Sequence, residues 1–324
     1  MTFAAGIWWA DLALFILGVS LLVKGSDWFV DAAAALARRV GVSEFVIGLT
    51  LVSIGTSLPE LASSVCAALQ GAGTFIIGNI VGSNIANIAL ILGAALVLGG
   101  GMSFDRLCSR RDMPILLAAG VLLAVWFFGA WDVPYASYGF GRVGGAVFLI
   151  GCVLYTLLLC KQHGTAEDAP DGAMPVGRAG GLVVLGPVMI TAGAKLMVDT
   201  VVVTAQRWGV DPLVIAITVV AVGTSLPELA VTISGVLKKR DDIALGNIVG
   251  SGIYNLLLII GCCAAISPLG TGGQSSVAAL AIMNGVALLL WLFMIFSRRL
   301  HRWQGWIFLL LYAGFVAWSV LFCR

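Results

Sequence analysis

Two carboxylates lie inside long apolar runs of this sequence, each directly after a proline. The hexapeptide GTSLPE at 55–60 recurs letter for letter at 223–228. A carboxylate at the centre of a bilayer costs about 2.5–3.5 kcal/mol on insertion scales, so Glu60 and Glu228 are expected to have a function there. We predict that the two copies together build one cation site.

Each motif surrounds its carboxylate with further oxygen atoms. Pro59 has no N–H and leaves the carbonyl of Gly55 without a helical partner, which is tolerated where the carbonyl lines a cavity or binds an ion. Thr56 lies one turn before Glu60 on the same helix face, and Ser57 adds a second hydroxyl. The second copy offers the same set: Gly223, Thr224, Ser225 and Glu228.

The apolar run that follows each motif adds a serine and an asparagine one turn apart. These pairs are Ser83 with Asn87 and Ser251 with Asn255. Such an inventory of oxygen ligands, without histidine or clustered cysteine, selects a hard cation: Na⁺, Ca²⁺, Mg²⁺ or Mn²⁺. Two glutamates carry a charge of −2, which matches one Ca²⁺ or two Na⁺.

Structural roles are the alternative for the single residues of these motifs. A proline can simply kink a helix, a Ser or Thr can bond to its own helix, and a glycine-rich run can serve helix packing. These structural roles do not explain two intramembrane glutamates that have no basic neighbour in sequence. The remaining charges are expected to be structural. Lys24 with Asp27, and Lys195 with Asp199, should form helix-end pairs or snorkel, and Asp241 and Asp242 should lie in a solvated loop.

The composition excludes a water-soluble domain. Of the 324 residues, 60% are hydrophobic and 10% charged, and the mean hydropathy is +1.06, so we predict an all-α polytopic membrane protein. A net charge of +2 gives no sign of nucleic-acid binding, and nothing suggests strands. Apolar runs predict ten transmembrane helices: 9–37, 43–69, 73–98, 113–131, 141–160, 179–205, 211–237, 242–266, 275–297 and 304–322.

Basic residues are divided unevenly between the two sets of alternate loops. One set holds thirteen Lys and Arg, and the opposite set, with both termini, holds three. By the positive-inside rule the first set faces the cytoplasm. We therefore expect a multi-pass protein of the cell's inner (plasma) membrane with both termini outside the cytoplasm.

The sequence also contains an internal repeat with an offset of 168 residues, the difference between Glu228 and Glu60. The same offset carries GNIVGS at 78–83 onto 246–251 without a gap. Five spans in each half is an odd number, so the halves must enter the membrane in opposite senses, as inverted repeats do. We predict a first half, 1–160, with its α-repeat at 43–98; a cytoplasmic linker, 161–178; and a second half, 179–324, with its α-repeat at 211–266.

The doubled GTSLPE cores, followed by GNIVGSNIAN and GNIVGSGIYN, resemble the α-repeats of the calcium/cation antiporter superfamily, and most closely prokaryotic sodium/calcium exchangers. The resemblance covers nearly the whole chain. It implies ten helices in two inverted halves, and alternating access that typically exchanges three Na⁺ for one Ca²⁺. It also implies that the first and sixth helices slide.

The resemblance assigns ligands by matching position. It implies that Glu60 and Glu228 bind Ca²⁺ with backbone oxygens of Thr56 and Thr224. It implies one Na⁺ site from Glu60, Ser83, Thr224, Ser225 and the Ala221 carbonyl, and another from Glu228, Ser251, Thr56, Ser57 and the Ser53 carbonyl. Asn87 and Asn255 would complete the middle. Asn255 stands where many relatives carry Asp, which resembles members that need no K⁺.

Other functions remain open at this point. A proton-coupled Ca²⁺ antiporter of the same superfamily is the main alternative, and Ser57 and Ser225 favour Na⁺ over it. An intramembrane enzyme is not expected, because both histidines, His163 and His301, fall in predicted loops. A passive channel would share the ligands. We expect no cofactor, only transported ions, and a protein that acts as a monomer in the lipid bilayer.

Overall fold

Helices make up nearly all of the described chain. The computed structural model describes residues 8–129, 139–161, 174–207, 223, 225–270 and 274–322. The first part contains α1 (Trp8–Val40), α2 (Glu44–Ile47), α3 (Ser53–Thr56), α4 (Leu58–Leu69), α5 (Gly73–Ile85), α6 (Gly93–Gly99), α7 (Met113–Gly129) and α8 (Arg142–Cys160). The second contains α9 (Val176–Arg207), α12 (Leu226–Leu237), α13 (Asp241–Tyr254), α14 (Gly261–Ile266), α15 (Gln274–Phe296) and α16 (Arg302–Phe322).

Several of these helices are joined without a loop by π-helical segments. They are η1 (Gly48–Val52), η2 (Ala86–Leu92), η3 (Cys108–Asp112) and η5 (Asn255–Ile260). Two of them, η2 and η5, begin beside or at the predicted ligands Asn87 and Asn255. Wide turns of this kind are rare and occur mostly at functional sites.

The second predicted span is bent where its proline lies. Its two parts, Glu44–Thr56 and Leu58–Leu69, meet at an angle of 48°. Ser57 separates them with φ −85° and ψ 5°, and Pro59 occupies the first turn of α4. Sharp helix bends are usually caused by proline, and Pro59 accounts for this one. The bend lies beside Glu60, where the sequence predicts a break in the helix.

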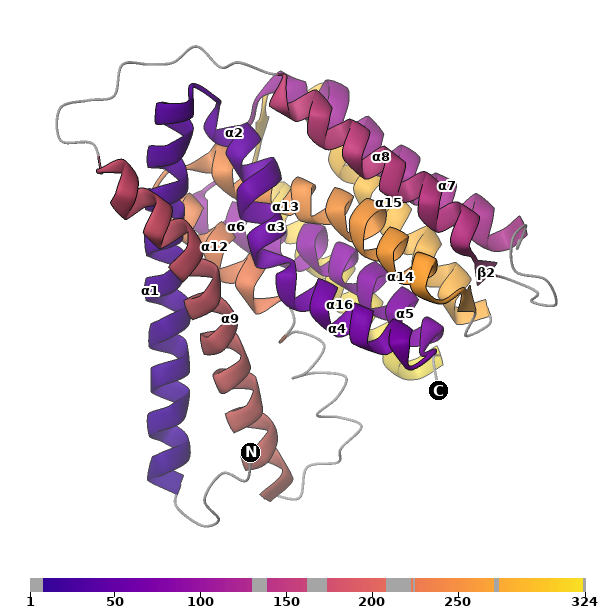
Figure 1. Cartoon of the computed structure of the whole chain (residues 1–324), viewed down its shortest axis with the longest axis horizontal. Coiled ribbons are helices and arrows are strands. Elements are labelled where there is room, and N and C mark those ends of the chain that lie inside the picture. The colour runs from indigo at the N-terminus through magenta and orange to yellow at the C-terminus, as the bar shows by residue number, and fades with distance from the viewer. Residues whose placement is uncertain are drawn as a thin grey trace.

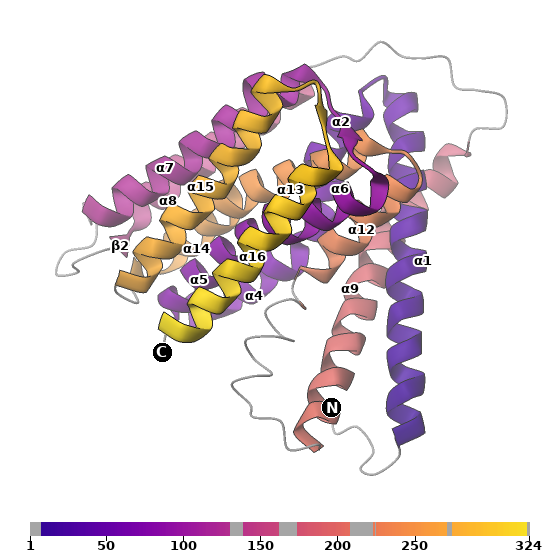
Figure 2. The ribbon, with the colours of Figure 1, turned by 180° about the vertical axis from the view of Figure 1, so that it is seen from behind.

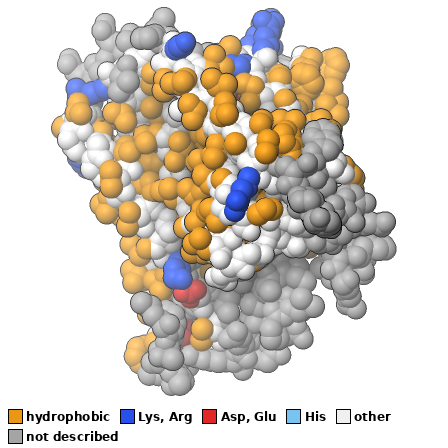
Figure 3. All heavy atoms as spheres, turned by 45° about the vertical axis from the view of Figure 1, so that its right-hand side comes forward, with side chains coloured by type: hydrophobic (Ala, Val, Ile, Leu, Met, Phe, Trp, Pro, Cys, Tyr) orange, Lys and Arg blue, Asp and Glu red, His pale blue; other side chains and the backbone are white. Residues whose placement is uncertain are grey.

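Seven helices within the described residues are long and apolar enough to cross a membrane, and the bent pair makes an eighth. The face in Figure 3 is accordingly covered largely by hydrophobic side chains with few charged ones. The prediction of a helical membrane protein is confirmed. The number of ten stays a prediction, since residues 211–222 of the seventh expected span lie outside the described residues.

Four two-residue strands, which the sequence did not suggest, join loops at the ends of the helices. Strand β1 (Met102–Ser103) pairs with β4 (Arg299–Leu300), and β2 (Gly139–Phe140) pairs with β3 (Leu269–Gly270), both antiparallel. The first pair joins two of the loops rich in basic residues, and the second joins two of the opposite set. Loops predicted to share a side of the membrane are therefore in contact.

Helices α1 and α9 lie side by side at one edge of the molecule, and one end of the pair packs against α2 and α12 (Figures 1 and 2). They touch through glycines. A Cβ on Gly18 would lie 3.0 Å from the Gly193 carbonyl oxygen, and one on Gly25 would lie 3.2 Å from that of Gly186. The offset of 168 relates Gly18 to Gly186 and Gly25 to Gly193, so the two contacts are equivalent under the repeat.

Glycines also bring α13 against the bent span. A Cβ on Gly246 would lie 2.9 Å from the Cα of Gly48, and one on Gly250 would lie 2.6 Å from the Leu49 carbonyl oxygen. Small residues let helix backbones approach this closely inside a membrane. The glycine-rich run therefore does serve packing, and this packing places the polar residues of α13 beside Thr56.

Candidate functional site

The two glutamates occupy equivalent places in the fold. Glu60 is in the first turn of α4 and Glu228 in the first turn of α12. The serine before each helix has nearly the same backbone conformation, with φ −85° and ψ 5° at Ser57 and φ −93° and ψ 7° at Ser225. Each glutamate is therefore the third residue of a helix that begins after a serine with a non-helical ψ.

Both carboxylates are removed from solvent, each with 1% of its surface exposed. Ser57, three residues before Glu60, hydrogen-bonds to Glu228, so the two motifs meet beside these carboxylates. No Lys, Arg or His of the described residues forms an ion pair with either one. Buried charge without a partner is strongly unfavourable, so each carboxylate needs either a bound cation or a proton.

Buried oxygens without a hydrogen-bond partner are found at the same two glutamates and near them. Five buried side-chain oxygen atoms of the described residues have no hydrogen-bond partner: both oxygens of Glu60, Oε2 of Glu228, and the amide oxygens of Asn87 and Asn255. All five belong to residues that the sequence predicts as ligands. Three buried side-chain nitrogens of the described part of the chain also lack a partner: Arg38 Nε, Asn87 Nδ2 and Arg111 Nη1. Buried polar atoms are nearly always satisfied, so the five oxygens are candidates for the coordination of a cation.

The first half reaches across to the second through its hydroxyls. Ser57 Oγ donates a hydrogen bond of 3.0 Å to Glu228 Oε1. Thr56 Oγ1 lies 3.0 Å from Asn247 Oδ1, to which it donates, and 3.5 Å from Ser251 Oγ. The structure thus brings two predicted ligands of the first motif, Thr56 and Ser57, into contact with residues of the other half.

Asn247 is a residue of this network that the sequence reasoning did not include. Its Oδ1 accepts from Thr56, and its Nδ2 donates to the Glu228 carbonyl at 3.3 Å and to Thr232 Oγ1 at 3.0 Å. Its repeat mate Asn79 makes the equivalent contact, with Nδ2 3.5 Å from Ser64 Oγ. The signal was present, because both asparagines stand in the repeated GNIVGS run.

The two asparagine-bearing segments also meet each other. Asn255 Nδ2 donates to Asn84 Oδ1 at 3.0 Å, and Asn84 Nδ2 donates to the carbonyl of Gly252 at 3.2 Å. Asn84 and Gly252 are repeat mates, so this contact lies where the halves join. A cavity of about 10 Å³, room for one water molecule, is lined there by Asn84, Asn87 and Gly252.

The remaining predicted ligands are placed as follows. The Ser53 carbonyl is buried and accepts from Thr56 Oγ1 at 3.3 Å and from Ser251 Oγ at 3.5 Å. Ser83 and Ser225 are buried. The predictions for Thr224 and Ala221 fall outside the described residues.

A larger cavity lies beside the prolines of the two motifs. It has a volume of about 230 Å³ and is lined by Pro59 and Pro227 and, from α9, by Lys195 and Asp199. Lys195 and Asp199 form the expected pair, with 3.7 Å between Nζ and Oδ2. The cavity therefore connects α9 with both proline motifs.

Charged groups tie α1 to the end of α12. Lys238 Nζ lies 2.8 Å from Asp31 Oδ2 and donates to the Asp27 carbonyl at 2.7 Å, and Ser234 Oγ donates to Asp27 Oδ1 at 2.7 Å. Asp27 does not pair with Lys24, because the tertiary packing of α1 on α12 brings Lys238 to Asp27. Lys24 is exposed, which is compatible with the alternative of a snorkelling side chain.

Asp241 and Asp242 also differ from the expected solvated loop. They form the first turn of α13. Asp241 Oδ2 accepts from the backbone N–H and the hydroxyl of Ser103, both at 3.0 Å. Acidic residues are stabilised at a helix N-terminus by the helix dipole, which accounts for their place here.

Comparison with known proteins identifies the family. The family model for the sodium/calcium exchanger protein matches residues 10–161 and 179–321. The chain is 36% identical to the sodium/calcium exchanger MaX1 of Methanosarcina acetivorans over 341 residues, covering 94% of this chain and 97% of the relative. It is 34% identical to the inner membrane protein YrbG of Escherichia coli, covering 95% of each.

A solved structure has the same fold. The sodium-calcium exchanger NCX_Mj, soaked with zero Na⁺ and Ca²⁺, superposes with a TM-score of 0.82 at 32% identity, covering 95% of this chain and 98% of the other. Both the sequence match and the structural match extend over nearly the whole chain. The protein is a multi-pass membrane protein that belongs to the sodium/calcium exchanger family.

Proposed function

We propose that this protein exchanges Na⁺ for Ca²⁺ across the membrane by alternating access. The observation that carries the proposal is the set of five unpartnered, buried oxygens on Glu60, Glu228, Asn87 and Asn255. Ca²⁺ takes about 6–8 oxygens at about 2.3–2.6 Å in a flexible geometry. Five side-chain oxygens together with nearby carbonyls and hydroxyls make a suitable set.

The same oxygens would serve both ions at different times. We assign Ca²⁺ to Glu60 and Glu228 with the backbone oxygens of Thr56 and Thr224. Flanking Na⁺ sites use the hydroxyls and carbonyls of the surrounding residues: Ser53, Ser57, Ser83, Ala221, Ser225 and Ser251. Because each Na⁺ would need a carboxylate that Ca²⁺ also needs, the two ions compete, and competition for one site is the basis of exchange.

Charge favours movement of the occupied site. Two carboxylates are neutralised by one Ca²⁺, and a neutral site crosses a low-dielectric barrier at a lower cost than a charged one. We propose a ratio of three Na⁺ to one Ca²⁺, which moves one net positive charge in each cycle. Transport would then respond to membrane potential.

The architecture that we propose has ten helices in two inverted halves, 1–160 and 179–324, joined by the linker 161–178. Its support is the equivalence of contacts under the offset of 168, such as the crossed glycine pairs of α1 and α9. These two helices lie at one edge of the molecule (Figure 1), and we propose that they slide against the other helices. The protein would act as a monomer in the inner membrane, with both termini outside the cytoplasm.

Radioactive Ca²⁺ uptake tests the proposal. Proteoliposomes loaded with Na⁺ and diluted into Na⁺-free buffer should accumulate ⁴⁵Ca²⁺, and an inside-positive potential set with K⁺ and valinomycin should speed up the Na⁺ efflux that drives it. Uptake that needs only a pH gradient would assign the protein to proton-coupled antiport instead. Ca²⁺ flux that is not stimulated by Na⁺ on the opposite side would indicate a channel.

A further inference from the structure

A polar hollow of about 520 Å³ lies between the beginning of α7 and the end of α15, away from the ion site. Three arginines from two distant segments line it: Arg106 just before the π-helical segment η3, Arg110 within it, and Arg298, two residues after the end of α15. All three are exposed and belong to the loops that are rich in basic residues. Trp291 and Phe296 also line the hollow.

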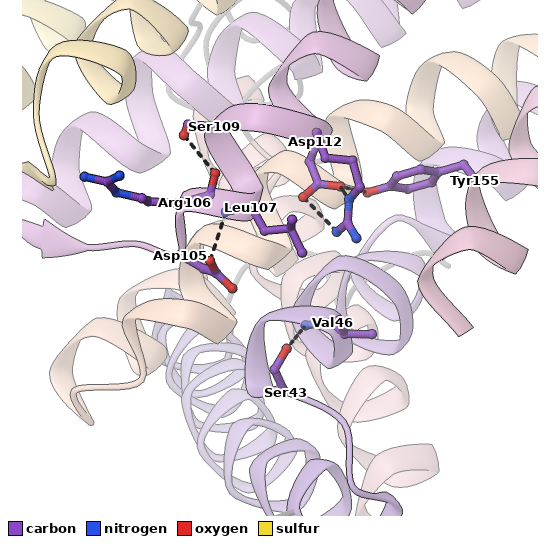
Figure 4. A network of polar contacts seen from close by, with 9 residues as sticks. Ser43, Val46, Asp105, Arg106, Leu107, Ser109, Asp112 and Tyr155 are labelled. Atoms are coloured by element: carbon purple, nitrogen blue, oxygen red, sulfur yellow. Dashed lines mark hydrogen bonds and ion pairs between the residues drawn. The ribbon is translucent and has the colours of Figure 1, made fainter. Parts of the chain in front are cut away.

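The acidic residues of this region are engaged elsewhere. Asp112 accepts from Arg111 Nε at 2.8 Å and from the Tyr155 hydroxyl at 3.0 Å, and Asp105 Oδ1 accepts from the backbone N–H of Leu107 at 2.9 Å. In Figure 4 the side chain of Arg106 extends away from both of these carboxylates.

None of the three arginines of the hollow forms an ion pair with a described residue. Their positive charge is therefore available to a ligand. Three guanidinium groups around one hollow repel each other, and an anion between them would relieve that repulsion.

The wall of the hollow is held in place by a specific contact. Trp291 Nε1 donates a hydrogen bond of 2.7 Å to the carbonyl oxygen of Ser109, which ties α15 to η3. The strand pair of Met102–Ser103 with Arg299–Leu300 fixes the two arginine-bearing segments to each other on the far side. The arginines are thus carried by segments of fixed relative position.

The surroundings of the hollow match those of a lipid. Phe296 is 84% exposed and Ile295 is 50% exposed at its rim, and α15 is one of the helices long and apolar enough to span the membrane. An apolar rim beside three guanidinium groups fits a molecule with an acyl chain and a phosphate. Arginine forks bind phosphate through paired N–H groups, and basic pockets between transmembrane helices bind anionic head groups.

We propose that this hollow binds the phosphate of an anionic phospholipid of the surrounding bilayer. The guanidinium groups of Arg106, Arg110 and Arg298 hold the phosphate, and the exposed side chains of Ile295 and Phe296 contact the acyl chain. The site is separate from cation transport and assigns the lipid a specific place on the protein.

Native mass spectrometry of the full chain in nonionic detergent tests the proposal. Phosphatidylglycerol and phosphatidylcholine with identical acyl chains are titrated, and bound lipid is counted. The test variant is R106Q/R110Q/R298Q, and the control R39Q/R178Q/K239Q removes three exposed charges from the same set of loops. We expect the wild type to retain one phosphatidylglycerol in preference to phosphatidylcholine, the test variant to bind it at least ten-fold more weakly, and the control to stay within two-fold.

Thermal unfolding of the same proteins separates lipid from free anion. Phosphatidylglycerol should raise the unfolding temperature of the wild type and the control more than that of the test variant, and inorganic phosphate at millimolar concentration should not reproduce the rise. An equal rise with inorganic phosphate would overturn the lipid assignment. Equal weakening by the test and control variants would show unspecific attraction to charge and would overturn the site.

Discussion

Ser57 Oγ lies 3.0 Å from Oε1 of Glu228 and donates a hydrogen bond to it. The two residues are 171 positions apart, and each stands in one copy of the repeated motif. The bond uses one oxygen of Glu228 and leaves Oε2 without a partner, whereas Glu60 has neither oxygen engaged. The two carboxylates are therefore equivalent in the repeat but differ in how many lone pairs they can offer to an ion.

We expect Glu60→Gln and Glu228→Gln each to abolish Ca²⁺ transport. Either change removes one of the two charges that neutralise a dehydrated divalent ion and places an N–H₂ group where an acceptor stands. Breaking a buried pair costs about 3–5 kcal/mol, or more than about 100-fold in affinity. The measurement is Na⁺-dependent ⁴⁵Ca²⁺ uptake into proteoliposomes.

Asp105→Asn is the matched control, because Asp105 is exposed and lies outside the site. It should transport Ca²⁺ within about two-fold of the wild type, as surface substitutions are usually small in effect. Near-normal flux in either glutamate variant would remove that residue from the site. Strong loss in all three variants would indicate a general defect in folding.

Ser57→Ala and Ser225→Ala should weaken Na⁺ dependence more than Ca²⁺ affinity. We propose that both hydroxyls are Na⁺ ligands and that neither binds Ca²⁺. A hydrogen bond to a charged group contributes about 1.5–3 kcal/mol, so the Na⁺ concentration for half-maximal exchange should rise about ten-fold or more. An equal loss of Na⁺ and Ca²⁺ affinity would contradict separate sites.

The sequence was most informative where a local pattern suffices. Apolar runs located the spans, and the duplication of GTSLPE indicated that Glu60 and Glu228 act together. The pairing of Asp27 with Lys238 and the role of Asn247 depend on which helix faces meet, and such contacts are set by tertiary packing of segments about 200 residues apart. The π-helical segments likewise have no local sequence signal of their own.

Lys238→Ala should shift the balance between the two faces of the transporter. Lys238 Nζ binds Asp31 and the Asp27 carbonyl on α1 at 2.8 and 2.7 Å, which holds α1 against α12 at this end. Partly exposed ion pairs contribute about 0.3–1 kcal/mol each, so the conformational equilibrium should move about 2–5-fold. Apparent Ca²⁺ affinity should rise at the face that bears Lys238 and fall at the other.

Half-maximal Ca²⁺ concentrations on the two sides of oriented vesicles measure this shift. Lys239→Ala is the control, since Lys239 is exposed and forms no ion pair within the described residues. Asp31→Asn should reproduce the effect of Lys238→Ala, and the double variant should add little, as expected for residues in one pair. Parallel changes of affinity on both faces would contradict a role for this contact in the conformational equilibrium.

Gly193→Ala and Gly180→Ala, two changes on the same helix, should have opposite effects on stability. A Cβ on Gly193 would lie 2.6 Å from both the Gly18 carbonyl oxygen and the Leu22 nitrogen, whereas one on Gly180 would have nothing within 4 Å. Alanine favours a helix over glycine by about 0.8–1 kcal/mol. In Gly180→Ala this gain in stability is the only expected effect. At 193 overpacking costs about 1–3 kcal/mol and outweighs this gain.

Thermal unfolding in detergent, followed by tryptophan fluorescence, should show a lower midpoint for Gly193→Ala and an unchanged or higher one for Gly180→Ala. Ca²⁺ exchange should fall only in the first variant, because α1 and α9 would be forced apart where we propose that they move together. The repeat predicts the same result for a second variant. Gly25 is the repeat mate of Gly193, and Gly25→Ala should also lower the unfolding midpoint, since its Cβ would lie 2.9 Å from Met189 Cβ and 3.1 Å from the Ile190 nitrogen. Normal stability in both variants would mean that the close crossing of α1 and α9 does not hold these helices together.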